Sequence, residues 1–168
     1  MDLVKLSIPY GFIRERTRLG WREVLFGMDN ELVSSEVPVE MAVEQLGIEE
    51  GPARALVALG GMEKWDSPRA YVESLADSEA TQSDEALNEK WLYLVLAWVF
   101  VNRVRFSDPL QKVEEIHADF GYPTRVAEFV RYTPSEEPDL SSRELNEQRL
   151  YRKWESYLDE MAAKYASR

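Results

Sequence analysis

One stretch of the chain, Trp91–Val101, places eleven apolar or aromatic residues in succession and limits what this chain can fold into. Ser83 precedes the run as a good helix N-cap, and Asp84 and Glu85 follow where negative charge stabilises a helix start. A buried strand is the alternative, because the run contains three valines, but the N-cap and the length favour a helix over about 84–102. A helix that is apolar on every side must be covered by other elements, since a membrane span needs about 18 apolar residues.

Helical spacing and helix-boundary signals recur along the rest of the chain. Apolar residues at helical spacing begin at Trp21, and Ser-Pro and Asp-Pro pairs open helices at Ser67 and Asp108. The polar stretch Asp77–Ser83 is expected to be the most mobile loop. The sequence therefore predicts an all-α fold, an irregular bundle of about eight helices around the central helix at about 84–102.

The C-terminal part of the chain predicts a separate long helix. A Pro-rich loop precedes Ser141 and Glu144, which form a capping-box pattern. Apolar residues then share one stripe as far as about Tyr165, which predicts an amphipathic helix within 133–168. A length of 168 residues suggests a single domain, 1–168.

Acidic residues are concentrated in one segment of the chain. The net charge is −11, from 20 Lys and Arg against 31 Asp and Glu. Within Val24–Glu89 there are three bases and fifteen acids, so the segment carries 3 − 15 = −12 and the remainder 17 − 16 = +1. Such a surface repels phosphates, which argues against nucleic acid, and it attracts a basic protein. The simpler reading is that the acidic surface only keeps the chain soluble.

Five glutamates in this segment are the candidate partner contacts. Glu36, Glu40 and Glu44 recur every four residues on one predicted helix, so they form one exposed stripe, and Glu49 and Glu50 follow that helix. Like charges at this spacing destabilise a helix by roughly 0.2–0.5 kcal/mol per pair. Contact with a basic partner is one reason for a chain to tolerate that cost.

Nucleophilic and metal chemistry finds little support in the residue inventory. There is no Cys and a single His, which excludes disulfides and thiolate zinc sites, and no phosphate loop or nucleophile elbow occurs. Glu114 and His117 have the spacing of half a di-iron carboxylate site, with Asp119 nearby, but a second His is missing. The simpler reading is a partly exposed His near a helix C-terminus. We predict no catalytic residue, no metal and no cofactor.

The location of the protein is predicted from two absences. The start, MDLVKLSIPYGF, lacks the basic region and long apolar core of a signal peptide, and no other run is long enough to span a bilayer. Together with the lack of Cys, this predicts a cytoplasmic protein without membrane contact. The oligomeric state stays open.

Four stretches resemble a bacterial family known only as a domain of unknown function. They are WREVLFG at Trp21–Gly27, EKWLY at Glu89–Tyr93, DPLQKVEEIHADFGYP at Asp108–Pro123, and FVRY at Phe129–Tyr132. In the third stretch, Gly121 is expected to end a helix in the left-handed conformation. The resemblance implies a small soluble bacterial protein, some members looking like immunity proteins for secreted toxins, and it carries over no catalytic residue.

The leading hypothesis is a non-catalytic bacterial protein that binds another protein. Its most concrete version is an immunity protein that neutralises a basic toxin through the acidic stripe at Glu36, Glu40 and Glu44. Two alternatives stay open: a small carboxylate- or metal-dependent enzyme centred on Glu114, His117 and Asp119, and a structural module without a separable activity.

Overall fold

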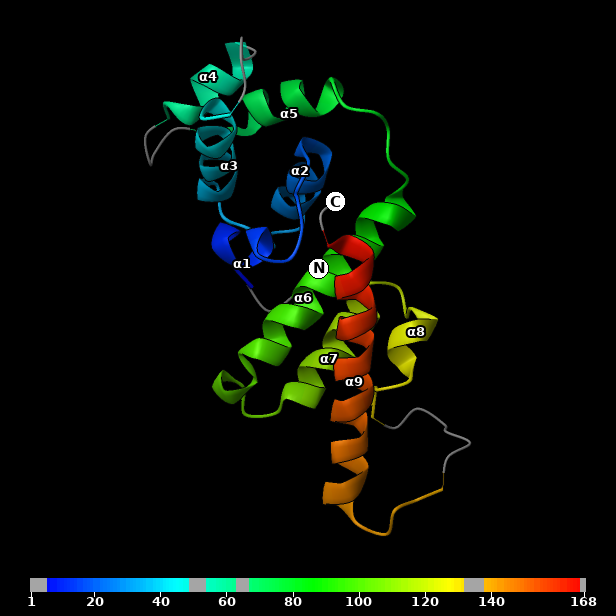
Figure 1. The fold of residues 1–168 in the computed structure, drawn as a ribbon. Coiled ribbons are helices and arrows are strands. Elements are labelled where there is room, and N and C mark those ends of the chain that lie inside the picture. Colours follow the sequence, from blue (N-terminus) through cyan, green and yellow to red (C-terminus); the bar gives the residue numbers. More distant parts are fainter. Residues whose placement is uncertain (1–5, 49–53, 63–66, 132–137, 167–168) are drawn as a thin grey trace. The chain divides into compact units, whose positions relative to one another are not determined.

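A computed structural model describes residues 6–48, 54–62, 67–131 and 138–166, and these contain helices and no strands, which confirms the all-α prediction. Figure 1 shows the helices in chain order. They are α1 (Tyr10–Arg14), α2 (Trp21–Asp29), α3 (Glu36–Leu46), α4 (Arg54–Gly60), α5 (Arg69–Asp77), α6 (Asp84–Val101), the 3₁₀ helix η1 (Arg103–Arg105), α7 (Pro109–Asp119), α8 (Thr124–Ala127) and α9 (Arg143–Tyr165).

The chain divides into two compact units. The N-terminal unit ends at Glu89, and the C-terminal unit spans Lys90–Ala166, so the boundary falls inside α6. Two compact units can belong to one domain or to two, so the expectation that residues 1–168 form a single domain stays a prediction.

Short helices build the N-terminal unit. In it α2 packs on α5, α3 packs on α4, and α4 also contacts α5, while α1 and α2 both contact α3. Most of the buried side chains are aliphatic or Met, and each of these contributes roughly 1.5–3 kcal/mol when it leaves water. They include Ile8, Ile13, Val24, Leu32, Val37, Met41, Leu56, Leu59 and Val72.

A carboxylate from a distant segment closes the N-terminus of α2. Both carboxylate oxygens of Glu79 accept backbone hydrogen bonds, from the N–H of Trp21 at 3.0 Å and from the N–H of Arg22 at 2.8 Å. The N–H of Gly20 is bound by Glu23 at 2.7 Å. These bonds satisfy donors that a helix start leaves open, and the negative charge suits the helix dipole. Glu79 lies in the stretch that we expected to be the most mobile, and its side chain ties that stretch to α2.

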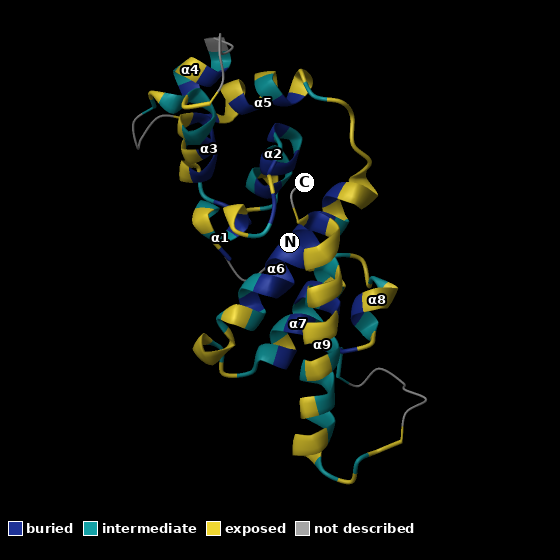
Figure 2. Ribbon diagram, in the orientation of Figure 1, coloured by how far each residue is buried: buried dark blue, intermediate teal, exposed yellow. Residues whose placement is uncertain are grey.

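Apolar burial organises the C-terminal unit. Every residue from Trp91 to Ala97, in the middle of α6, is buried (Figure 2). Val101, at the end of the helix, is 54% exposed. Aromatic rings make the contacts within the unit: Tyr93 stacks on Tyr165 at 5.6 Å between ring centres. Phe100 meets Trp154 edge-on at 5.0 Å. Among the described helices none is long and apolar enough to cross a membrane.

The helix ends show how local sequence sets the turns. After α7, Gly121 has φ 80°, and the N–H of Tyr122 donates to the carbonyl of His117 at 2.8 Å, which is the Schellman geometry expected for Gly121. At α9 the predicted cap is wrong by one residue. Ser142, not Ser141, caps the helix by accepting from the N–H of Leu145 at 3.3 Å. Ser141 instead turns the chain at φ 62°.

Replacing Glu79 by Ala should lower the free energy of unfolding by about 1–2 kcal/mol, because two backbone donors at the start of α2 lose their acceptor. Urea denaturation monitored by circular dichroism measures the change. Asp77→Ala is the matched control, since Asp77 is exposed at the end of α5, and its effect should stay within about 0.5 kcal/mol. Equal effects of the two substitutions would show that the contact to α2 contributes nothing.

Candidate partner-binding site

Helix α3 separates an apolar face from an acidic one. Val37 and Met41 are buried, while Glu36 and Glu40 are exposed. The four-residue spacing therefore places these two glutamates on the solvent side of the helix, as predicted. Glu49 and Glu50, the other two predicted contacts beyond the helix, lie outside the described residues.

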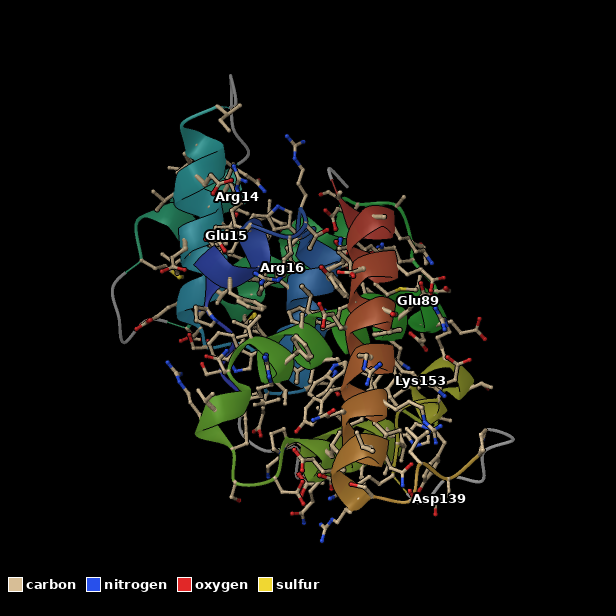
Figure 3. The ribbon with its side chains drawn as sticks, turned by 60° about the horizontal axis from the view of Figure 1, so that its bottom comes forward. Arg14, Glu15, Arg16, Glu89, Asp139 and Lys153 are labelled. Atoms are coloured by element: carbon tan, nitrogen blue, oxygen red, sulfur yellow. The ribbon has the colours of Figure 1, made fainter. Side chains whose placement is uncertain are left out.

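The third glutamate of the stripe is engaged within the chain. The carboxylate of Glu44 accepts from Arg14 Nε at 2.6 Å and from the Tyr10 hydroxyl at 3.2 Å. Figure 3 shows Arg14 with Glu15 and Arg16 at the end of α1. Burial, followed by the negative charge and hydrogen bond of Glu44, raises the pKa of Tyr10 to about 12. Glu44 is thus less available to a partner than Glu36 and Glu40, because Arg14 already neutralises it.

Glu36 and Glu40 border a surface hollow of about 250 Å³. The segment from Ser7 to Gly11 and the residues Ser34 and Val37 complete its lining. Within the described part of the chain neither glutamate makes a hydrogen bond or an ion pair. Two carboxylates, which only accept, and hydroxyl groups, which can also accept, suit the N–H donors of a lysine or arginine side chain.

Other acids of the −12 segment have structural partners. Asp29 and Glu73 both bind Arg69, at 2.6 Å and 2.9 Å, and Glu79 caps α2. The acidity of this segment is therefore not spread evenly over its surface. Among the described glutamates of α3, the two without a partner, Glu36 and Glu40, both border the hollow.

The residues of the alternative enzyme hypothesis are engaged in separate contacts. Glu114 binds Arg131 Nε at 2.9 Å. His117 Nε2 lies 3.2 Å from the carbonyl oxygen of Pro123, which can only accept, so Nε2 carries the proton and donates. The ring also packs edge-on against Tyr122 at 5.4 Å. Among the described residues no three His, Asp or Glu side chains are placed to hold a metal ion together.

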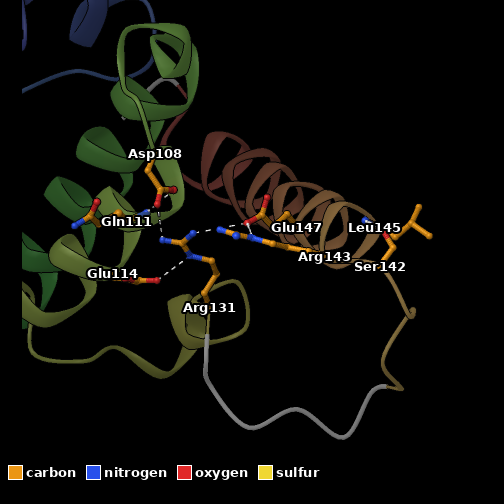
Figure 4. Close-up of polar contacts among 8 residues, drawn as sticks. All are labelled: Asp108, Gln111, Glu114, Arg131, Ser142, Arg143, Leu145 and Glu147. Atoms are coloured by element: carbon orange, nitrogen blue, oxygen red, sulfur yellow. Dashed lines mark hydrogen bonds and ion pairs between the residues drawn. The ribbon is translucent and has the colours of Figure 1, made fainter.

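In the C-terminal unit, Arg131 lies among three carboxylates (Figure 4). Its side chain is only 11% exposed, and its guanidinium binds Asp108 and Glu114 at 2.9 Å each and approaches Glu147 at 3.7 Å. The other oxygen of Asp108 caps α7 through the N–H of Gln111 at 3.3 Å. One cation thus links the N-cap residue and the middle of α7 to α9.

The charge of Arg131 is secured by these carboxylates. Burial disfavours the cation, but hydrogen bonds and the negative charges of Asp108 and Glu114 outweigh it and raise the pKa of Arg131 above its ordinary value. Sequence reasoning missed this cluster, although Arg131 lies in the FVRY stretch, because its partners are 17 and 23 residues away along the chain.

The fold and the surface define a small all-α protein with an acidic hollow beside α3 and a partly buried arginine cluster that links α7 to α9. Residues 10–162 match the model of a family described as uncharacterised proteins conserved in bacteria (DUF2247), and the chain belongs to this family. The match confirms the resemblance drawn from four stretches and extends it into α9. No curated protein and no solved structure shows a significant match.

Replacing Arg131 by Met should lower the free energy of unfolding by about 1–3 kcal/mol, because Asp108 and Glu114 then lose their cation, while Glu147 keeps its pair with Arg143. Arg125→Met is the control: Arg125 also bridges two carboxylates, those of Glu128 and Glu160, but at the exposed surface. Its loss should cost less than about 1 kcal/mol. Urea denaturation compares the two variants, and similar losses would contradict a special role for Arg131.

Replacing Glu44 by Gln should lower the pKa of Tyr10 from about 12 toward 10.0, since a negative charge beside the phenol disappears. Absorbance at 295 nm during alkaline titration reports this change, with Tyr10→Phe subtracted to isolate the residue. The folded chain keeps this proton to higher pH than the unfolded chain, so the associated stability falls as the pH rises from about 10 to about 12. Superimposable titration curves would rule out the Glu44 contribution.

Proposed function

We propose that this protein acts by binding a basic protein partner, and that the partner inserts a lysine or arginine side chain into the hollow beside Glu36 and Glu40. The observation that carries the proposal is the state of these two carboxylates. Both are exposed, both line the hollow, and in the described residues neither is neutralised by the chain itself. A cationic side chain that enters the hollow gains charge-assisted hydrogen bonds there.

The most specific form of this proposal is an immunity protein in the bacterial cytoplasm that neutralises a basic toxin. The net charge of −11 supports it, because a strongly acidic protein attracts a basic one over long range and speeds their encounter. An acidic surface seated on the basic residues of a toxin would also exclude a polyanionic substrate from them. The family resemblance points in the same direction.

An enzymatic role has less support from the geometry. Glu114 is held by Arg131, and the imidazole Nε2 of His117 donates to a backbone carbonyl. Each group serves a contact within the C-terminal unit, and these contacts favour a structural role for both.

The test compares two variants with equal charge change. Glu36→Gln with Glu40→Gln removes two charges at the hollow, and Asp77→Asn with Glu85→Gln removes two exposed charges elsewhere. Tagged wild-type protein and both variants are used to capture partners from the native cell at low salt, followed by quantitative mass spectrometry. We expect a basic protein that wild type and the control retain equally, and that the hollow variant retains at least tenfold less. High salt should release it.

Two outcomes would contradict the proposal. Equal recovery by both variants would remove the hollow from the interface, and recovery of no stoichiometric basic protein would remove the binding function. The toxin form is tested by expressing the captured protein in a heterologous bacterium. Growth should stop without the wild-type chain and resume with it.

A further inference from the structure

A second surface feature lies on the C-terminal unit and shares no residue with the acidic hollow. It is a groove of about 450 Å³ where the end of α6, η1, the start of α7 and one turn of α9 meet. Its apolar lining, named here the aromatic groove, is Phe100, Val104, Phe106, Pro109 and Tyr151. Phe100, Phe106 and Tyr151 are only partly buried, so their rings remain accessible.

The edge of the groove exposes apolar side chains that soluble proteins usually cover. Val104 is 92% exposed, and Val101, one turn earlier, is 54% exposed. A single exposed valine is ordinary, but here Val104 lines an aromatic groove and Val101 lies three residues before it in the chain. This edge fits an apolar side chain from another molecule.

Arginines surround this apolar surface. Arg103 lies over the ring of Phe100, with its guanidinium carbon 4.4 Å from the ring centre, and it donates to the carbonyl oxygen of Phe100 at 2.8 Å. Arg152 lines the groove, and Arg105 ends η1. A stacked guanidinium keeps in-plane N–H groups for further acceptors. Glu155 is the one acid in the lining, against two arginines.

These arginines lack the carboxylate partners that other arginines of the unit have. Arg125, Arg131 and Arg143 each bind at least one Asp or Glu. For Arg103, Arg105 and Arg152 there is no ion pair with any described residue, in a chain with 31 acids and 20 bases. In the described part of the chain, the groove therefore presents arginines without an ion-pair partner beside exposed apolar surface.

We propose that the aromatic groove binds an acidic peptide segment of a second protein partner. An apolar or aromatic side chain of the peptide lies on Phe100, Phe106 and Tyr151, and flanking carboxylates pair with the arginines. Arginine and aromatic rings also suit single-stranded nucleic acid, but the exposed aliphatic side chain of Val104 in the lining fits an apolar peptide side chain better than a nucleobase. This inference does not rest on the proposed function, because the acidic hollow selects the opposite charge.

The experiment selects peptides from a phage library of random 12-residue sequences on the purified full chain. Enriched sequences should carry two or more Asp or Glu around a Leu, Ile, Phe, Trp or Tyr. Synthetic copies are then titrated by fluorescence polarisation, with Asn and Gln versions of the same peptides. We expect the amide versions to bind at least tenfold more weakly, and added salt to weaken the acidic peptides.

Two variants and a control assign the binding to the groove. Arg103→Gln with Arg152→Gln should weaken the peptides at least tenfold. Val104→Asp should do the same, and it leaves the fold intact because Val104 is 92% exposed. Arg125→Gln with Arg143→Gln removes two charges from the same unit and should change affinity less than twofold.

The proposal is overturned if no acidic peptides are enriched, or if the groove variants bind them as wild type does. Binding of a ten-residue uridine oligonucleotide that the groove variants lose, without any acidic peptide binding, would replace the peptide by RNA. Enrichment of basic peptides alone, lost with Glu36→Gln and Glu40→Gln, would overturn the groove proposal while supporting the function proposed for α3.

Discussion

Water cannot solvate a helix whose side chains are apolar in every direction, and the C-terminal unit is arranged around this constraint on α6. Its central residues Trp91–Ala97 are all buried. The covering contacts are aromatic, because a ring buries a large area with few rotatable bonds. Trp154 is the clearest case, since it touches Phe100, Phe129 and Tyr151 and so joins three elements in one cluster.

The acidic surplus of the chain serves two different purposes. Some carboxylates replace missing hydrogen-bond acceptors or bind arginines, as Glu79 does at α2 and Glu44 does at Arg14. Glu36 and Glu40 have no such task among the described residues. The net charge of the sequence counts engaged and unengaged carboxylates alike. Only unengaged ones, such as Glu36 and Glu40, can contribute free energy to the binding of a cation. The burial and partners of each carboxylate therefore matter more than the count.

Features set by neighbouring residues could be predicted from the sequence, and features set by tertiary pairing could not. The helix at 84–102, the cap at Asp108 and the left-handed Gly121 depend on a few adjacent residues. The partners of Arg131 and Glu79 are brought together only by the fold. The sequence predicted Ser141 as the cap of α9, and the structure has Ser142, because both serines have the same capping chemistry and only the backbone turn distinguishes them. At the candidate site the helix face of Glu36 was predictable, but the pairing of Glu44 with Arg14 was not.

The bond between Glu79 and the start of α2 also bears on the order of folding. It joins residues 58 positions apart, so it closes a long loop that encloses α2 to α5. Closing such a loop costs chain entropy before any contact repays it, and contacts of this kind form late. We therefore expect this link to leave the folding rate of the N-terminal unit nearly unchanged and to slow its unfolding. The carboxylate of Glu79 thus lengthens the lifetime of the folded N-terminal unit more than it speeds its formation.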